Sequence, residues 1–500
     1  MSVFDVVVVG GGGAGLAAAI EARALGREVV LLEKNPALGG STAWSIGSIT
    51  ASATPHQIRK GIKDRPEDHF LDMALFAGEL DGRDNPQLRR ILCEALPDTF
   101  RWLEGLGVRF YGPMPEPPHK QPRMHNVLPS SRSYIVHLER RARRLGVAVR
   151  TGCRVRGLLC EGERVVGVEV EGGSSFRARG AVVLAAGDFT AGTALKERFM
   201  GEREAHIEAV NPTATGDGQE MGLALGARVV NGDLALGPEL RCVPPPEGGL
   251  IRRLPPWPLL ATTVAWSLDH MPPALLRPFV MRFVTTALAP SPALFEEGAI
   301  LVNRQGERFG DELDEPAYAL AEQEGKAGFI LLDGRLARMF QAWPHYISTA
   351  PGVAYAYLSD YRRNRPDVHA EAADLQSLGQ RLKMQPGVLA ATVATYNGAA
   401  GNRPRLERGP YVALGPVRPV FVHAEGGLAV DDQHRVLDAD DRPIPGLYAA
   451  GATGQGGLLL KGHGHHLAWA FVSGRRAGRH AAFEVASGRD EAAAFAPESL

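Results

Sequence analysis

The stretch that decides the fold is Asp5-Val-Val-Val-Val-Gly10-Gly-Gly12-Gly-Ala-Gly15, an apolar run that leads directly into a glycine-rich turn. Gly10 permits a tight turn, Gly12 lets the backbone approach a pyrophosphate, and Gly15 allows a helix to contact the strand closely. A helix that begins at this turn offers unpaired N–H groups to phosphates. The stretch therefore predicts a dinucleotide-binding fingerprint.

The residues after the turn fit this prediction. Residues 16–25 are good helix formers, Gly26 is a suitable C-cap, and residues 28–32 read as a second apolar strand. Glu33 ends that strand, where its carboxylate can accept hydrogen bonds from a ribose. Glycine triplets also occur in ordinary loops, but the order strand, turn, helix, strand argues against that alternative. The fingerprint does not distinguish FAD from NAD.

Composition excludes several classes of protein. The 500 residues are too many for one hydrophobic core, so we expect two domains or one domain with an insertion. A formal charge of −1 and the lack of a basic stripe with aromatic residues argue against a nucleic-acid partner. No uncharged run is long enough to span a membrane. The cysteines show no CxxC spacing and no signal peptide is evident, so we expect a cytoplasmic protein with reduced thiols: Cys93, Cys153, Cys160 and Cys242.

The middle of the chain has a different composition. Proline and glycine accumulate from residue 244, and residues 259–295 are apolar with a few charges. Two interpretations of that apolar segment stay open. It forms core helices of a second domain, or it forms a hydrophobic substrate mouth that makes peripheral contact with a membrane. Another connection rich in proline, glycine and arginine, residues 398–410, precedes the return to the first domain.

Five further motifs occur in a characteristic order. They are Gly39-Gly-Ser-Thr-Ala, Asn211-Pro-Thr-Ala-Thr-Gly-Asp-Gly218, Val302-Asn-Arg-Gln-Gly-Glu-Arg-Phe309, Gly426-Gly-Leu-Ala-Val-Asp431 and Gly446-Leu-Tyr-Ala-Ala-Gly451. Together with the fingerprint they resemble the FAD-dependent fumarate reductase flavoproteins and 3-ketosteroid dehydrogenases. The resemblance runs from residue 5 to about residue 480, and residues 245–295 match least.

The resemblance implies an α/β protein with a Rossmann-like FAD-binding domain built from both chain ends and an inserted α+β capping domain. We expect the FAD-binding domain at residues 1–240 and 423–488, the cap at 241–422, and a tail at 489–500. FAD should be held non-covalently, because residues 41–47 lack the histidine that links flavin covalently in one branch of the family. No second complete GxGxxG unit is present, so electrons must be exchanged with an external carrier or acceptor.

The predicted cofactor-binding residues combine the fingerprint with the family motifs. They are Gly10, Gly12, Ala14, Gly15, Glu33, Lys34, Gly40, Ser41, Thr42, Val155, Ala186, Gly187, Thr215, Asp217, Gly451, His466 and Leu467. Thr215 and Asp217 offer oxygen atoms to sugar or ribityl hydroxyls. His466 lies near the start of the last long helix, whose N–H groups can stabilise the charge of reduced flavin. Ala452 stands where family members often have glutamate, so one ribityl contact is missing.

Three residues are candidates for the chemistry. By resemblance, Arg308 matches a proton-donating arginine that Glu312 can orient, His423 matches a histidine that binds a substrate carboxylate, and Lys461 matches an arginine that clamps it. Lysine is a point charge without the bidentate fork of arginine, so its grip on a carboxylate is weaker. The alternatives are an Arg–Glu pair that only fixes the cap and a structural histidine. Leu460 stands where the steroid dehydrogenases carry their catalytic tyrosine.

Other polar residues are weaker candidates. Tyr111 and Tyr318 are predicted mainly to pack, and Arg123 with His125 matches an Arg/His pair near substrate in fumarate reductases. The cluster His463, His465 and His466 suggests a metal, but no carboxylate or cysteine accompanies it locally, so we expect no metal site.

The preferred interpretation is an enzyme that moves a hydride between flavin N5 and a C–C bond beside a carbonyl or carboxylate of a small molecule. Such a reaction needs a proton carrier and positive donors around the oxygen. The nearest alternative is a 3-ketosteroid-like dehydrogenase acting on a hydrophobic ketone. An alternative of another class is a flavoprotein electron-transfer subunit or a flavin-binding sensor.

Overall fold

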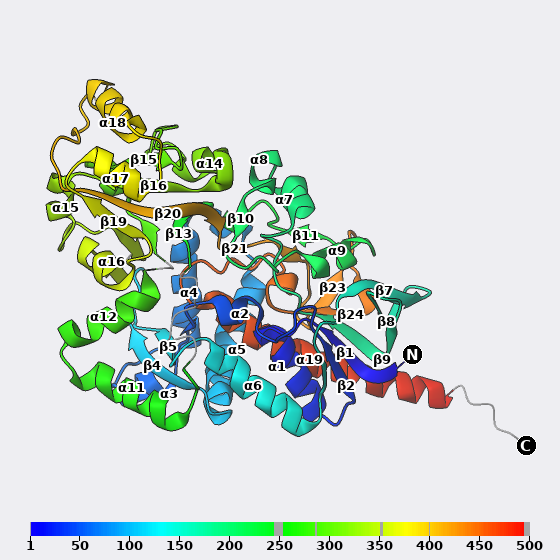
Figure 1. Ribbon diagram of the computed structural model, residues 1–500. Coiled ribbons are helices and arrows are strands. Elements are labelled where there is room, and N and C mark those ends of the chain that lie inside the picture. Colours follow the sequence, from blue (N-terminus) through cyan, green and yellow to red (C-terminus); the bar gives the residue numbers. More distant parts are fainter. Residues whose placement is uncertain (1, 245–253, 286–287, 351–353, 400, 495–500) are drawn as a thin grey trace, which may run out of the picture.

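The glycine-rich turn follows the central strand of a mostly parallel sheet. The computed structural model describes residues 2–244, 254–285, 288–350, 354–399 and 401–494 (Figure 1). The strands of the first sheet are, in spatial order, β23 (Arg435–Leu437), β24 (Pro443–Ala449), β9 (Ser175–Leu184), β1 (Ser2–Val9), β2 (Val29–Leu32) and β6 (Ala148–Arg150). A hairpin of β7 (Val155–Glu161) and β8 (Arg164–Val170) joins this sheet, because β8 also pairs with β9. Strand β24 comes from the carboxy-terminal part of the chain and pairs in parallel with β9. The prediction that both chain ends build one α/β domain is confirmed.

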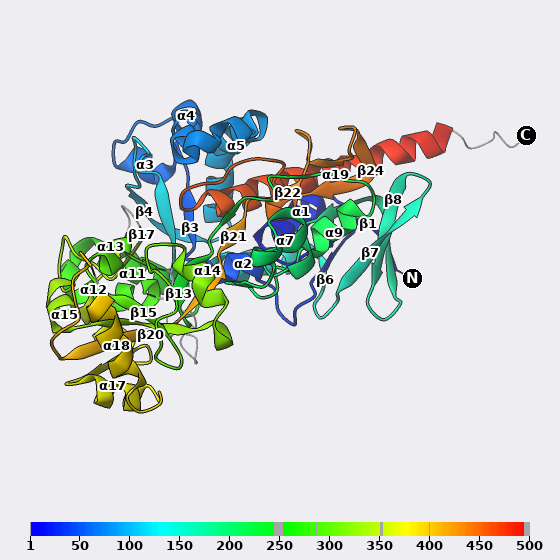
Figure 2. The ribbon, with the colours of Figure 1, turned by 90° about the horizontal axis from the view of Figure 1, so that it is seen from above.

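Valine side chains make β1 a buried strand. Val6, Val7 and Val8 are fully buried, and β1 pairs in parallel with β2 on one side and β9 on the other. Continuous runs of β-branched residues are typical of strands that are covered on both faces. Helices α1 (Gly13–Ala24) and α19 (His465–Ala494) lie along this sheet (Figures 1 and 2), and α6 (Arg132–Leu145) packs against α1.

Glycine allows α19 to cross α1 closely. A Cβ on Gly478 would lie 2.1 Å from the carbonyl oxygen of Ala18. A side chain at this position would therefore push the two helices apart. The predicted tail, residues 489–500, begins inside α19, because this helix continues to Ala494; residues 495–500 lie outside the described part of the chain.

A helical layer and a small sheet follow the first βαβ unit. The elements are α2 (Gly40–Trp44), β3 (Ser48–Thr50), α3 (Pro55–Arg59), α4 (Pro66–Ala77), α5 (Pro86–Gly105), β4 (Arg109–Met114) and β5 (Met124–Leu128), and the order of the three strands is β3-β5-β4. After β9 come α7 (Thr193–Phe199), α8 (Glu202–Ala205) and α9 (Asp217–Leu223). Short strands then lead to the cap and back, because β12 (Ala235–Leu236) pairs with β21 (His423–Ala424).

The cap has its own sheet and its own hydrophobic core. Its strands are β10 (Glu208–Ala209), β20 (Tyr411–Phe421), β16 (Gly328–Leu332) and β15 (Ile300–Asn303), with β13 (Glu239–Cys242) and β19 (His369–Ala372) also paired to β20. Helices α14 (Pro316–Ala321), α15 (Gly334–Met339), α16 (Leu358–Asn364), α17 (Leu375–Arg381) and α18 (Val388–Ala399) belong to this part. A smaller sheet joins β14 (Ala289–Pro290), β17 (Ser348–Ala350) and β18 (Ala354–Ala356). The second core runs from Leu240 to Val417 and is separate from the core around β1.

The apolar segment after residue 256 forms two helices, α11 (Pro258–His270) and α12 (Pro273–Val284). Only Ala261 of α11 is buried, so this helix does not serve as a core helix of the cap. It contacts β4 and β5 of the amino-terminal part, whereas α12 contacts α16 of the cap. Among the described residues, no helix combines the length and the hydropathy that crossing a membrane requires.

Candidate active site

A cavity of about 520 Å³ lies between the FAD-binding sheet and the cap. Its walls come from the glycine-rich turn, α2, the loop after β9, the segment before α9 and the first turn of α19. The cap closes one side with Glu239, Arg241, Ala289, Thr349 and Ala350. Because both parts of the chain contribute, the cavity can hold a cofactor on one side and a substrate on the other.

The glycine-rich turn forms one end of this cavity. A Cβ on Gly10 would lie 2.2 Å from the carbonyl oxygen of Ala185, and its φ of +107° favours glycine. A Cβ on Gly15 would lie 1.9 Å from the carbonyl oxygen of Gly10, so α1 approaches β1 as closely as the sequence predicted. Gly12 is the N-cap of α1 and provides no side-chain cap, which leaves N–H groups of the first turn available to an anion.

Glu33 is a buried carboxylate beside the turn. One of its oxygens accepts a hydrogen bond of 2.7 Å from the backbone N–H of Gly11, and the other accepts bonds from the backbone and side chain of Asn35. These bonds fix the carboxylate at the end of β2, where it lines the cavity. This is the position at which a ribose would meet it.

Lys34 connects Glu33 to the segment that contains Thr215 and Asp217. Its Nζ donates hydrogen bonds of 2.5 Å to Thr215 and 3.0 Å to Asp217. Burial would raise the pKa of Asp217, but bonds from Thr215 and Lys34 lower it overall. Asp217 lines the cavity at the Glu33 end, which favours the sugar over the ribityl alternative.

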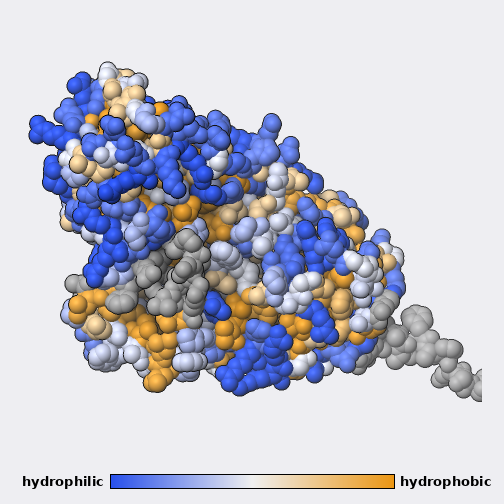
Figure 3. Space-filling view, viewed as in Figure 1, coloured by the Kyte–Doolittle hydropathy of each residue, from blue (hydrophilic) through white to orange (hydrophobic). Residues whose placement is uncertain are grey.

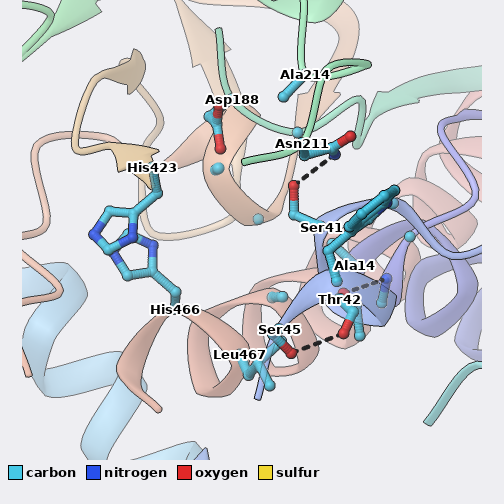
Figure 4. A pocket seen from close by; sticks show the side chains of 18 of the residues that line it. Ala14, Ser41, Thr42, Ser45, Asp188, Asn211, Ala214, His423, His466 and Leu467 are labelled. Carbon is cyan, nitrogen blue, oxygen red and sulfur yellow. Dashed lines mark hydrogen bonds between the residues drawn. The ribbon is translucent and has the colours of Figure 1, made fainter. Parts of the chain in front are cut away.

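Hydroxyl groups of α2 hold the backbone around the cavity (Figure 4). Ser41 accepts a hydrogen bond of 2.9 Å from the side chain of Asn211, and Thr42 accepts one of 3.1 Å from the N–H of Gly13. These bonds join the glycine-rich turn, α2 and the Asn211 loop into one frame. Ser41 and Thr42 were predicted as site residues, whereas Asn211 was not, although it opens the motif Asn211–Gly218.

The opposite end of the cavity carries a cluster of charged and ionisable side chains. The Nε2 atoms of His423 and His466 each lie 3.6 Å from Oε1 of Glu425, and Nζ of Lys461 lies 3.9 Å from the same oxygen. The two imidazole rings are 3.8 Å apart between centroids (Figure 4). Glu425 itself is fully buried, and its other oxygen accepts hydrogen bonds from Gln455 and from the N–H of Leu460.

This cluster holds Glu425 ionised and His423 neutral. Burial alone would raise the pKa of Glu425, but the charge of His466 and the two imidazoles 3.6 Å away outweigh this effect and keep the pKa well below the usual value. The pKa of His423 is lowered to about 4, mainly by burial and also by the charge of the neighbouring His466, and Glu425 offsets only part of this shift. One buried carboxylate is therefore the shared counter-ion of three groups that can carry a proton: His423, His466 and Lys461.

Sequence reasoning missed Glu425, which lies behind His423 and Lys461, and Asp188, which lines the cavity. Glu425 follows His423 by two residues and directly precedes the motif Gly426–Asp431, so its acidic side chain could have been recognised in the sequence. Asp188 follows Gly187 and is buried, with its oxygen bonded to the N–H and hydroxyl of Thr190. Burial raises the pKa of Asp188, and this carboxylate lines the cavity.

Most of the predicted residues lie at this cavity. Those that line it are Gly10, Gly12, Ala14, Glu33, Lys34, Gly40, Ser41, Thr42, Val155, Ala186, Gly187, Asp217, Gly451, His466 and Leu467, together with His423 and Lys461. Gly15 packs beneath the turn, and Thr215 acts through Lys34, so neither lines the cavity. Ala452 also lines it.

Arg308 lies elsewhere. Its guanidinium forms two hydrogen bonds of 2.8 Å with Glu312 and lies 5.5 Å from the ring centre of Tyr396 on α18. Glu312 also binds Arg403, so these groups tie β15 to α18 at the outer end of the cap (Figure 1). The expected convergence of Arg308 with His423 and Lys461 is thus not found, because the ion pair holds it within the cap.

Other candidates take structural positions. The Tyr111 hydroxyl bonds Asp269, and the Tyr318 hydroxyl donates to Glu204. Arg123 is fully buried and binds both Asp64 and Asp72.

A second histidine group, His69, His119 and His465, is close enough for a metal. His119 Nδ1 lies 2.8 Å from Arg123, which only donates, so its proton is on Nε2. That proton blocks the nitrogen that would bind a metal.

Replacing Arg308 with lysine is expected to leave turnover within about 3-fold of the parent enzyme, because the side chain does not line the cavity. The bidentate pair with Glu312 would be lost, so we expect a loss of stability of about 1 kcal/mol. Steady-state rates and thermal unfolding measure the two effects. A rate lowered about 100-fold, as expected when a general acid is removed, would instead indicate that Arg308 takes part in the reaction.

Known proteins that are similar to this chain include several reductases. The chain is 27% identical to the NADH:fumarate oxidoreductase of Klebsiella pneumoniae over 90% of its length, but it spans only 44% of that protein. It is 27% identical to a fumarate reductase (cytochrome) of Shewanella frigidimarina, covering 96% of the chain and 77% of the relative. It is also 27% identical to the urocanate reductase of Eggerthella lenta, with coverages of 96% and 74%.

The fold has close counterparts among solved structures. The open conformation of a flavocytochrome c3 fumarate reductase superimposes with a TM-score of 0.70 at 25% identity, covering 97% of this chain and 79% of the other. The 3-ketosteroid-Δ4-(5α)-dehydrogenase of Rhodococcus jostii shares the fold, with a TM-score of 0.58 at 24% identity and coverages of 96% and 97%. The family model described as FAD binding domain matches residues 5–253 and 264–459. The chain therefore belongs to the FAD binding domain family that includes fumarate reductase flavoproteins.

Proposed function

We propose that this protein is an FAD-dependent oxidoreductase that moves a hydride between flavin N5 and a C–C bond adjacent to a carbonyl or carboxylate. The observation that carries the proposal is one cavity that has the dinucleotide fingerprint at one end and the pair His423 and Lys461 at the other. The named relatives that act on fumarate and urocanate support the same reaction class.

The cavity fits FAD. Its glycine turn leaves no room for side chains, α1 presents uncapped N–H groups, and Glu33 offers a fixed carboxylate to a ribose. When bound, FAD supplies or accepts the hydride at N5. We propose non-covalent binding, because the segment from Ser41 to Gly47 contains no histidine. His466 and Leu467 at the start of α19 would face the flavin ring.

The charged end of the cavity would bind the substrate oxygen. Lys461 offers a cation, and His423, kept neutral by burial, offers one N–H to the same oxygen. We assign the proton transfer to His466, whose Nε2 is buried without a hydrogen-bond partner among the described residues and faces the carboxylate of Glu425. Glu425 is then a positioning residue that favours the protonated form of its neighbours.

The balance of charges favours a substrate with a single polar group. Lys461 faces the ionised Glu425, and Arg241 forms an ion pair of 2.5 Å with Glu239 on the cap side. Each cation of the cavity therefore has its own carboxylate, which weakens its attraction for an anion. A conjugated ketone or monocarboxylate fits this environment better than a dicarboxylate does.

The electron partner would be a separate carrier, because the chain has no second dinucleotide fingerprint. All four cysteines are free thiols, which agrees with a reducing compartment such as the cytoplasm.

Anaerobic titration of the chemically reduced holoenzyme tests the proposal. We expect α,β-unsaturated ketones or monocarboxylates to reoxidise the flavin, and Lys461→Met to lower the second-order rate about 100-fold while FAD stays bound. Loss of one oxyanion donor has an effect of this size. Reoxidation by steroid enones alone would indicate the ketosteroid-like alternative, and reaction with artificial acceptors but with no unsaturated carbonyl compound would indicate an electron-transfer subunit or sensor.

A further inference from the structure

The surface of α11 and α12 is unusually apolar for a face exposed to water. Large exposed hydrophobic residues gather here: Trp257, Leu259, Trp266, Met271, Leu275 and Val280. Leu259 is 80% exposed and Trp257 is 67% exposed, so these side chains contact little protein. Figure 3 shows this apolar surface at the lower left edge of the molecule, where Figure 1 has α11 and α12. Monomeric proteins seldom leave such a patch uncovered without a use for it.

Helical spacing puts the apolar residues of α11 on its outer face. Leu259 and Trp266 are seven residues apart, which is two helical turns, and both are exposed. The face between them carries Thr263, whose hydroxyl bonds the backbone of Leu259 within the helix. No charged residue of α11 precedes Asp269, which is bonded to Tyr111. An apolar body can therefore enter or meet this face without burying an unpaired charge.

A basic helix lies next to this apolar face. Helix α6 carries five arginines and one glutamate, and Arg140, Arg141 and Arg144 are exposed. Its His137 hydrogen-bonds the backbone of Pro256, two residues before α11 begins. In Figure 3 a hydrophilic patch over α6 adjoins the apolar patch along the lower edge. The two patches together offer apolar side chains flanked by positive charge.

We propose that this face docks onto an anionic lipid surface. Leu259 and Trp266 would enter the boundary between headgroups and acyl chains, as the apolar face of an interfacial helix does. Tryptophan is favoured at this depth because its ring is apolar while its N–H stays hydrated. The arginines of α6 would attract the negative headgroups, and this attraction falls off within a Debye length. A neutral protein surface would not be attracted by the arginines of α6, whereas an anionic lipid surface would be, so charge complementarity favours the anionic lipid.

Sedimentation of the holoenzyme with vesicles tests the proposal. We expect binding to phosphatidylcholine vesicles that contain phosphatidylglycerol, and at least about 10-fold weaker binding to phosphatidylcholine alone or at high salt. The double variant Leu259→Ser/Trp266→Ser should lower binding at least about 10-fold, because two large apolar side chains would be lost. The variant Arg141→Glu/Arg144→Glu should also lower it, mainly at low salt.

Phe483→Ser is a matched control, because Phe483 is an aromatic residue 55% exposed on α19, a helix that lies away from α11 (Figure 1). It should bind vesicles like the parent, and the flavin spectrum of each variant reports whether the fold is intact. Failure of the parent to sediment with anionic vesicles at low salt would overturn the proposal. So would a dimer that Leu259→Ser/Trp266→Ser dissociates while vesicle binding stays unchanged, because a second copy would then cover this face.

Discussion

Replacing Gly15 with alanine is expected to give a protein that binds FAD at least about 100-fold more weakly. The new Cβ would lie 1.9 Å from the carbonyl oxygen of Gly10, and Cβ atoms do not approach a backbone oxygen so closely. Helix α1 must then move away from β1, and its N–H groups no longer meet the pyrophosphate at the same place. Overpacking of this kind costs about 1–3 kcal/mol or more, and about 2.7 kcal/mol corresponds to 100-fold in affinity. The ratio of flavin absorbance to protein absorbance measures the loss.

Gly157→Ala is the matched control for this variant. Gly157 lies in β7 of the same domain, and a Cβ there would meet no atom within 4 Å. We expect this protein to remain yellow and to unfold at the temperature of the parent. If Gly15→Ala folds cooperatively and retains FAD as well as Gly157→Ala does, then the turn does not hold the pyrophosphate.

The FAD-binding half was predictable because its signals are local in sequence. The strand, the turn and the helix of the fingerprint follow one another from Asp5 to Leu25, so periodicity and glycine spacing report their contacts directly. The pairing of β24 with β9 is not local, and the family resemblance predicted only that both chain ends build one domain. Hydrogen bonds such as that from Asn211 to Ser41 were beyond reach, because they depend on how loops 170 residues apart meet.

The end of the cavity that carries His423 and Lys461 was predicted less well, again because its contacts are not local in sequence. Arg308 and Glu312 are four residues apart, and their mutual ion pair was already the alternative to a catalytic role. Which of the two applies depends on how the cap is oriented, and a motif does not encode that orientation. Glu425 was not predicted, because its burial beside Lys461 depends on how the segment after β21 packs against the loop before α19.

Hydropathy alone did not decide whether residues 259–295 form core helices or surface helices. Apolar helices look alike in sequence whether they enter a core or remain on the surface, because periodicity does not report what covers them. In the structure α12 packs on α16 through the pair of Arg277 and Asp360, whereas α11 keeps its apolar face exposed. Core and surface helices therefore differ here only in their tertiary contacts, and the exposed face of α11 is a surface whose role can be tested.

Replacing Glu425 with glutamine is expected to lower turnover about 100-fold, the size expected when general acid catalysis is lost. The carboxylate has a pKa well below its usual value and is ionised, with His466, His423 and Lys461 within 4 Å. Glutamine has a similar shape but no charge, so the protonated forms of these neighbours lose their counter-ion. The alkaline limb of the pH–rate profile should therefore move to lower pH. A residue that only supports packing would not shift that limb.

The pH dependence of stability follows from the same groups. Glu425 has a lowered pKa in the folded protein, so its contribution is present above its unfolded pKa and is lost as the pH falls toward the folded value. His423 has a folded pKa of about 4, below its unfolded value near 6.5, so its neutral form also favours folding at higher pH. The contribution of His423 weakens as the pH falls from about 6.5 to about 4, and the contribution of Glu425 weakens only below about pH 4.5, its unfolded pKa. In Glu425→Gln the carboxylate part of this acid sensitivity should disappear.

Glu312→Gln separates loss of a buried carboxylate from loss of catalysis. Glu312 is buried like Glu425 and binds Arg308, Arg403 and the N–H of Leu301, but it lies in the cap. We expect this variant to lose about 1–3 kcal/mol of stability and to keep turnover within about 3-fold of the parent. If Glu425→Gln behaves in the same way, with an unshifted pH profile, Glu425 only supports the fold, and the proton must reach the substrate by a route that does not use the cluster around His466.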